Sequence, residues 1–187
     1  MKKITALLLV GFALVLQNCD KEDEPDNRPV ARFTPSGYNQ PVPCTINLIN
    51  NSSNATSYSW SLGDGTTTTN PNPTKTYTAI GTYYVTLKVT GPNGSDSICR
   101  SITLDQVLPN ESTFSYYMDK CSGTPVNVQF YSLNPQSQYH AWDFGNGITS
   151  PEANPLMRFE TPGNYTIKYS SQISGIRDTI IRAFQIN

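Results

Sequence analysis

The sequence is poor in histidine and in charge: one histidine occurs in 187 residues, and charged residues make up 14% of the chain. A single imidazole leaves little basis for histidine metal sites or catalytic triads. The 13 lysines and arginines face 14 aspartates and glutamates, so no basic excess is available to neutralise phosphates, and we expect no nucleic-acid partner. Low charge also argues against coiled coils and helix bundles, which are rich in Ala, Glu, Lys and Leu.

The chain is rich in residues that form turns. Its 12 glycines and 14 prolines accompany abundant Thr, Ser and Asn, a balance that favours short strands joined by turns. The sequence therefore predicts an all-β fold. The length allows one large domain or two small ones.

A short apolar run follows Lys2 and Lys3. Residues 4–16 are apolar apart from Thr5 and Gly11. Thirteen residues are too few to cross a hydrocarbon core of about 30 Å, but they fit the apolar region of a secretory signal peptide. We expect residues 1–18 to be removed.

The end of this run, Leu16-Gln17-Asn18-Cys19, resembles the lipobox of bacterial lipoproteins, with Asn18 in place of the usual small residue. The resemblance implies that Cys19 becomes the lipidated first residue and anchors the protein in the membrane; the alternative is an ordinary cysteine after a conventional signal peptide. Lys21-Glu22-Asp23 resembles a lipoprotein export signal of some Gram-negative bacteria, which implies an outer-membrane protein facing the cell exterior. The alternative here is a solvated acidic tether. Residues 19–29 are polar and contain two prolines, so they should form a disordered tether.

An internal repeat governs the remaining sequence. Trp60-Ser61-Leu62-Gly63-Asp64-Gly65 recurs in the second half of the chain as Trp142-Asp143-Phe144-Gly145-Asn146-Gly147. Two units of about 80 residues follow, at 30–106 and 107–187, each large enough for its own core. The same displacement relates Thr67 to Thr149, Asn72 to Asn154, Pro73 to Pro155, Gly81 to Gly163, Tyr83 to Tyr165, Asp96 to Asp178, Ile98 to Ile180 and Arg100 to Arg182.

Apolar residues within each unit alternate with polar ones. Period two predicts strands with one buried face, and turn clusters such as Gly63-Asp64-Gly65 separate them. Short strands with regular turns are typical of β-sandwiches. The alternating sets include Tyr58, Trp60 and Leu62; Tyr83, Val85, Leu87 and Val89; Val126, Val128 and Phe130; and Tyr165, Ile167 and Tyr169.

The repeated motif, followed by Asn72-Pro73, Tyr77 and Gly81-Thr82-Tyr83-Tyr84-Val85, resembles the signature of PKD domains, a family with an immunoglobulin-like fold. The second unit resembles it too, with Phe159 in the position of Tyr77 and Asn146 in place of the second aspartate. The resemblance spans roughly residues 30 to 187. It implies two tandem immunoglobulin-like β-sandwiches.

The residues that could carry chemistry have simpler structural roles. Trp60 and Trp142 should fill cores, and Gly-Asp-Gly should form a tight turn. Asp64 lacks the D-x-D-x-D-G spacing of a calcium loop. His140, on the strand face of Trp142, has no G-x-S-x-G motif to serve. We expect no catalytic residue, no metal and no cofactor.

Three cysteines remain after Cys19. Thiols of exported proteins are usually oxidised to disulfides. A bridge between Cys44 and Cys99 resembles one seen in some PKD domains and ranks first, although their strand phases differ. The alternative, Cys99 with Cys121, would lock the two units at a fixed angle.

Binding by such domains usually comes from exposed aromatic side chains. Strand phase predicts that Tyr84, Tyr117 and Tyr131 point outward, where tyrosines could stack on a sugar or fill a protein interface. The sequence thus favours a non-catalytic surface lipoprotein acting as a spacer or as a polysaccharide- or protein-binding module. The alternative is an accessory subunit of an outer-membrane enzyme, uptake or secretion complex.

Overall fold

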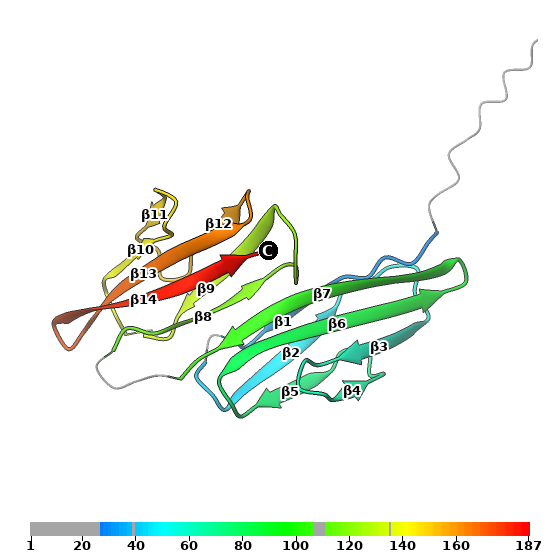
Figure 1. Cartoon of the computed structure of the whole chain (residues 1–187). Helices are drawn as coiled ribbons and strands as arrows, with labels where there is room; N and C mark the ends of the chain where they lie inside the picture. Colours follow the sequence, from blue (N-terminus) through cyan, green and yellow to red (C-terminus); the bar gives the residue numbers. More distant parts are fainter. Residues whose placement is uncertain (1–26, 39, 107–110, 135) are drawn as a thin grey trace, which may run out of the picture.

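The computed structural model describes residues 27–38, 40–106, 111–134 and 136–187, which form strands, turns and loops only (Figure 1). Four expectations lie wholly or mostly outside the described residues: the signal peptide at 1–18, the lipidation of Cys19, the export signal at 21–23 and the tether at 19–29. No helix able to span a membrane is found in the part of the chain that the structure covers. The all-β prediction is confirmed.

Sandwich 1 consists of two sheets. One has the order β1-β2-β5, with β1 at Phe33–Ser36, β2 at Cys44–Asn50 and β5 at Thr74–Tyr77. The other has β4, β3, β6 and β7 side by side, at Thr67–Thr68, Ser57–Ser61, Gly81–Gly91 and Gly94–Leu104.

Sandwich 2 repeats this arrangement. Strands β8 (Phe114–Met118), β9 (Val126–Ser132) and β12 (Leu156–Phe159) match the first sheet, and β10 (His140–Asp143), β11 (Thr149–Ser150), β13 (Gly163–Ile173) and β14 (Ile176–Ile186) match the second. Five strands of sandwich 2 lie at one constant displacement from their counterparts in sandwich 1, and the displacement is the same at both ends of each strand. The pairs are β2 with β9, β4 with β11, β5 with β12, β6 with β13 and β7 with β14. This is the displacement that relates the two tryptophan motifs, so the sequence repeat is a repeat of strands.

Each sandwich has its own core. Trp60 is 0% exposed and Trp142 is 2% exposed, which confirms the prediction that both fill cores. Sandwich 1 buries aliphatic side chains such as Ile46, Leu48 and Val85 around Trp60. Sandwich 2 is richer in rings: Trp142 lies 4.1 Å from Tyr169 and 5.1 Å from Phe114, measured between ring centroids.

The turn after each tryptophan brings two backbones together. Gly63 and Gly145 have φ angles of 82° and 72°. A Cβ on Gly63 would lie 2.7 Å from the backbone N of Tyr84, and one on Gly145 would lie 2.7 Å from the backbone N of Thr166. Only glycine meets both requirements without strain, so these positions are turn residues, as the motif predicted.

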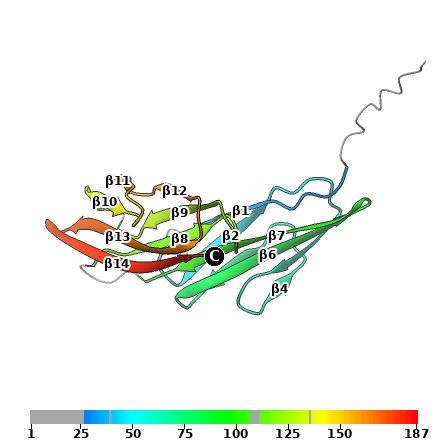
Figure 2. The same cartoon turned by 45° about the horizontal axis from the view of Figure 1, so that its top comes forward.

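The two sandwiches share a sheet. Strand β7 pairs with β8 through Ser101 with Met118, Ile102 with Tyr117, and Thr103 with Tyr116. One seven-stranded sheet therefore runs through the molecule, in the order β12-β9-β8-β7-β6-β3-β4 (Figures 1 and 2).

The two cores lie on opposite faces of this shared sheet. Directly paired residues point to the same face. Ile102 belongs to the core of sandwich 1, so its partner Tyr117 also points toward sandwich 1. Tyr116, the neighbour of Tyr117, packs against the core of sandwich 2 on the other face.

Candidate functional site

A disulfide joins the two sandwiches. Cys99 of β7 is bonded to Cys121, which follows β8, and their Cα atoms are 5.5 Å apart, a separation within the usual range for disulfides. The bond lies beside the β7–β8 pairing and adds a covalent link to it. The sequence left this pairing open as an alternative, and it is the one that the structure contains.

The pairing of Cys44 with Cys99 that ranked first is wrong. Cys44 is a free cysteine, 1% exposed, whose Sγ–H donates a hydrogen bond to the carbonyl oxygen of Gly37 at 3.2 Å. It lies on β2 and points into the core of sandwich 1. Cys99 pairs with Thr86 on the outer face of that sandwich, so the two thiols face away from each other. Burial raises the pKa of the Cys44 thiol.

Three tyrosines pack together between the sandwiches and line an open hollow of about 400 Å³ there. Tyr38, between β1 and β2, is 5% exposed, and its ring centroid lies 5.1 Å from that of Tyr117 and 4.6 Å from that of Tyr131. The hydroxyl oxygens of Tyr38 and Tyr131 are 2.8 Å apart. Ser115 donates from Oγ to the carbonyl oxygen of Tyr38 at 2.7 Å, in a buried hydrogen bond. Burial first, and then the hydrogen bond to Tyr131, raise the pKa of Tyr38 well above its ordinary value.

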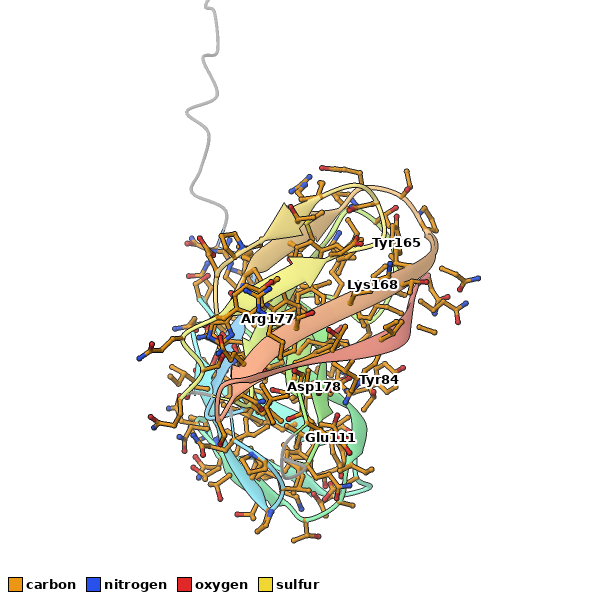
Figure 3. The ribbon with its side chains drawn as sticks, turned by 90° about the vertical axis from the view of Figure 1, so that its left-hand side faces the viewer. Tyr84, Glu111, Tyr165, Lys168, Arg177 and Asp178 are labelled. Carbon is orange, nitrogen blue, oxygen red and sulfur yellow. A yellow bond between two sulfur atoms is a disulfide. The ribbon has the colours of Figure 1, made fainter. Side chains whose placement is uncertain are left out.

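Tyr117 and Tyr131 are half-buried, so the predicted solvent exposure of these two rings is only partly correct. Both rings point away from the core of sandwich 2, as strand phase required, but sandwich 1 covers that face, and both pack against the core of sandwich 1. Tyr84 is different: it is 53% exposed on the opposite face of the shared sheet, beside the junction (Figure 3). Of the three nominated tyrosines, Tyr84 alone is an open surface ring.

Polar contacts reinforce the junction at both ends of the β7–β8 pairing. Arg182 of β14 forms an ion pair with Asp105, just after β7, and donates to the carbonyl oxygen of Phe114 at 3.3 Å. Arg100 of β7 donates to the carbonyl oxygen of Asp119, also at 3.3 Å. The two repeated arginines therefore both bridge the sandwiches: Arg100 reaches from sandwich 1 to sandwich 2, and Arg182 reaches from sandwich 2 to sandwich 1.

Asp64 holds the motif turn of sandwich 1. Its Oδ1 accepts hydrogen bonds from the Thr66 backbone N–H at 3.1 Å and from Thr66 Oγ1 at 2.6 Å, and its Oδ2 lies 2.5 Å from Lys75 Nζ. Burial opposes ionisation, but the bonds from Lys75 and Thr66 outweigh it and lower the pKa of Asp64 to about 2. In sandwich 2, the Oδ1 atom of Asn146 accepts from the Ile148 N–H. Both side chains act as turn residues.

His140 is a packed histidine. Its Nδ1 lies 2.8 Å from the Tyr169 hydroxyl and its Nε2 lies 3.1 Å from the Ser137 carbonyl oxygen. Burial lowers the pKa of His140, so the ring is neutral at pH 7. In the described ranges, no group of three or more His, Cys, Asp or Glu side chains could hold a metal ion.

A family model described as PKD domain matches residues 26–105. The first sandwich is a PKD domain. Among solved structures, this chain is similar to the PKD1 domain of the Vibrio cholerae metalloprotease PrtV, with 38% identity over 42% of this chain and 99% of that chain and a TM-score of 0.38. It is also similar to the PKD1 domain of Vibrio anguillarum Epp, at 26% identity over 43% and 96% of the two chains and a TM-score of 0.38.

A further similar structure was solved in work on the promiscuous specificity of carbohydrate-binding modules from the β-sandwich superfamily. It is 20% identical over 79% of this chain and 59% of that chain, with a TM-score of 0.41. PKD domains are non-catalytic modules. The arrangement at the junction of this PKD domain with sandwich 2 is suited to holding two modules in place, because its groups are paired with one another.

Proposed function

We propose that the chain is a non-catalytic lipoprotein of the bacterial outer membrane, anchored through Cys19 and facing the exterior, in which two PKD domains act as a spacer and binding module. The lipobox-like end of the apolar run and the motif at 21–23 support the anchor and its outward orientation, and the junction supports the spacer. A shared sheet, a disulfide between Cys99 and Cys121, and the packed ring of Tyr38 each oppose rotation of one sandwich against the other.

A spacer of this kind gains from rigidity. A rigid connection keeps a binding surface at a fixed distance and orientation from the anchor, and it reduces the entropy lost when that surface binds. The repeat supports assigning sandwich 2 to the same family, because its strands follow those of sandwich 1 at a constant displacement.

Surface display is tested with protease added to intact cells. We expect the full chain to be cleaved on intact cells, and we expect replacement of Lys21, Glu22 and Asp23 by alanine to protect it. An untouched periplasmic protein in the same cells is the control for membrane integrity. A chain that is degraded only after lysis would contradict the outward orientation.

Binding is tested on a glycan array with the purified full chain in detergent, and the same array is assayed for released sugars. The expected result is retention of one glycan class without cleavage. The Tyr84→Ala variant tests the exposed ring, with an expected loss of about 1 kcal/mol if it stacks on the ligand. Thr86→Ala, on the same face of β6, is the matched control. Hydrolysis of an arrayed glycan would overturn the non-catalytic proposal.

A further inference from the structure

A hollow lies on the outer face of the β11-β10-β13-β14 sheet in sandwich 2. It has a volume of about 500 Å³. Paired residues define its rows: Asp143 lies opposite Lys168 and Thr149, Ala141 lies opposite Ser170, and Ser170 lies opposite Thr179. The floor therefore consists of the small side chains of Ala141, Ser170 and Thr179.

Charged and aromatic side chains border this floor at two ends. At one end, the Oδ2 atom of Asp143 lies 3.8 Å from Lys168 Nζ, while Oδ1 accepts a hydrogen bond from the Gly145 N–H. At the other end, the guanidinium carbon of Arg177 lies 4.0 Å from the ring centroid of Tyr139. Lys168 and Arg177 mark these ends in Figure 3.

The length of the hollow follows from strand geometry. Lys168 pairs with Ile181, and Gln172 pairs with Arg177, so the two ends are four residues apart along each strand. At about 3.4 Å per residue this is about 14 Å, which is the length of a short oligosaccharide.

The polar groups in and beside the hollow can still donate or accept hydrogen bonds to a ligand. The guanidinium group of Arg177 is solvent-exposed beside the Tyr139 ring and makes no hydrogen bond or ion pair with the residues that the structure describes. Lys168 and Asp143 are separated by more than a hydrogen-bond length. The Ser170 and Thr179 hydroxyl oxygens lie 2.7 Å apart and provide further donors and acceptors.

Sandwich 1 provides an internal comparison, because the same face there has different chemistry. At the corresponding positions of the first repeat, Tyr139, Asp143 and Arg177 are replaced by serines, and Lys88 stands where sandwich 2 has Ser170. The scaffold is repeated, whereas this set of side chains is not. Asp143 also accepts a hydrogen bond within its own motif turn, but Tyr139 and Arg177 have no such turn role and would be expected in both copies if they only maintained the fold.

We infer that this hollow binds an acidic oligosaccharide, with a uronate carboxylate at Arg177 and sugar hydroxyls at Asp143, Ser170 and Thr179. Lys168 and Asp143 line the hollow, and Arg177 borders it by packing on the lining residue Tyr139, so the charge in and beside the hollow is net positive. The guanidinium fork fits a carboxylate in a bidentate arrangement. The inference rests on the proposed binding function and names its ligand class and its site.

The test uses the purified full chain and an array of oligogalacturonates beside the corresponding neutral oligogalactosides. We expect binding to the acidic series, and a loss of affinity of about tenfold or more in Arg177→Gln. Ser170→Glu places a longer, negatively charged side chain on the floor and should weaken binding of the acidic series as well. Arg158→Gln, on the other sheet of the same sandwich, is the matched control and should bind like the wild type. The thermal transition of each variant should be unchanged.

The results separate this inference from the proposed function. If arrayed glycans bind but Arg177→Gln and Ser170→Glu retain the wild-type affinity, the hollow is not the site, although the binding function stands. Equal binding of neutral and acidic series would overturn the assigned ligand class, as would an oligoglutamate peptide that binds with the same dependence on Arg177. If no glycan binds at all, the glycan-binding function itself fails.

Discussion

Trp60 and Trp142 occupy equivalent places in the two cores, yet their indole N–H groups differ. Trp142 Nε1 donates to the carbonyl oxygen of Glu152 at 2.8 Å, whereas Trp60 Nε1 has no partner within the described residues. A buried donor without a partner carries the cost of its desolvation. The two tryptophans therefore contribute equally as volume but unequally as hydrogen-bonding groups.

Truncation of either tryptophan should destabilise its own sandwich. We expect Trp60→Ala and Trp142→Ala each to cost about 3 to 5 kcal/mol, because each leaves a large cavity. Trp→Phe should separate the two sites: Trp60→Phe removes an unpaired donor and should cost less than Trp142→Phe, which loses a hydrogen bond. Chemical denaturation gives the four values, and an equal cost for both Phe variants would contradict the difference in hydrogen bonding.

Asp64 should make the stability of sandwich 1 depend on pH. Its pKa falls from 3.8 to about 2 on folding, so its contribution is full above about pH 4 and is lost as pH falls from about 4 to 2. After allowance for solvent screening we expect about 1 kcal/mol at pH 7. Asp64→Asn should lose this at pH 7 and match the wild type near pH 2. Asn146→Ala in sandwich 2 is the control and should show no such pH dependence.

At the scale of strands, sequence phase was a sound guide inside each sandwich and an incomplete one between them. The constant displacement between the two motifs predicted the repeated strands, and period two identified Trp60 and Trp142 as core residues. The exposure of Tyr117 and Tyr131 was misjudged because phase gives the direction of a side chain and does not say what covers it. A signal was present: β8 carries large rings on both faces, Tyr116 and Tyr117, which is typical of a strand covered on both sides.

The prediction that Cys44 pairs with Cys99 was wrong for a related reason. The resemblance to some PKD domains favoured a bridge within one unit, whereas the pairing of β7 with β8 brings Cys121 to Cys99 across the junction. Pairing between units cannot be read from strand phase alone. The phase mismatch of Cys44 and Cys99 was the correct indication, and the buried position of Cys44 on β2 explains it.

Reduction should reveal which cysteines are paired. The disulfide spans a sequence separation of 22, so opening it should cost about 3 kcal/mol through the entropy of the unfolded chain. We expect a reductant to lower the melting temperature of the wild type and of Cys44→Ala, and to leave the double variant Cys99→Ser with Cys121→Ser unchanged. If Cys44→Ala became insensitive to reductant, the pairing with Cys121 would be refuted.

For the whole molecule, the decisive prediction concerns the anchor. Cys19→Ala should prevent lipidation and move the protein from the membrane fraction to the soluble fraction of lysed cells. Immunoblots of the two fractions measure this, and Cys44→Ala is the matched cysteine control, since it should stay with the membrane. Retention of Cys19→Ala in the membrane fraction would refute lipid anchoring through this residue.

The Cys99–Cys121 bond also has a mechanical consequence. If the chain were held at its anchor and pulled from the far end of sandwich 2, tension would pass through this covalent bond and bypass the segment between the two cysteines. That segment, with a sequence separation of 22, would stay out of the extended length until the bond was reduced, which hides about 75 Å of chain. Stretching of single molecules with and without reductant should show this difference, and the junction would then act as the part of the molecule that tension reaches but cannot open.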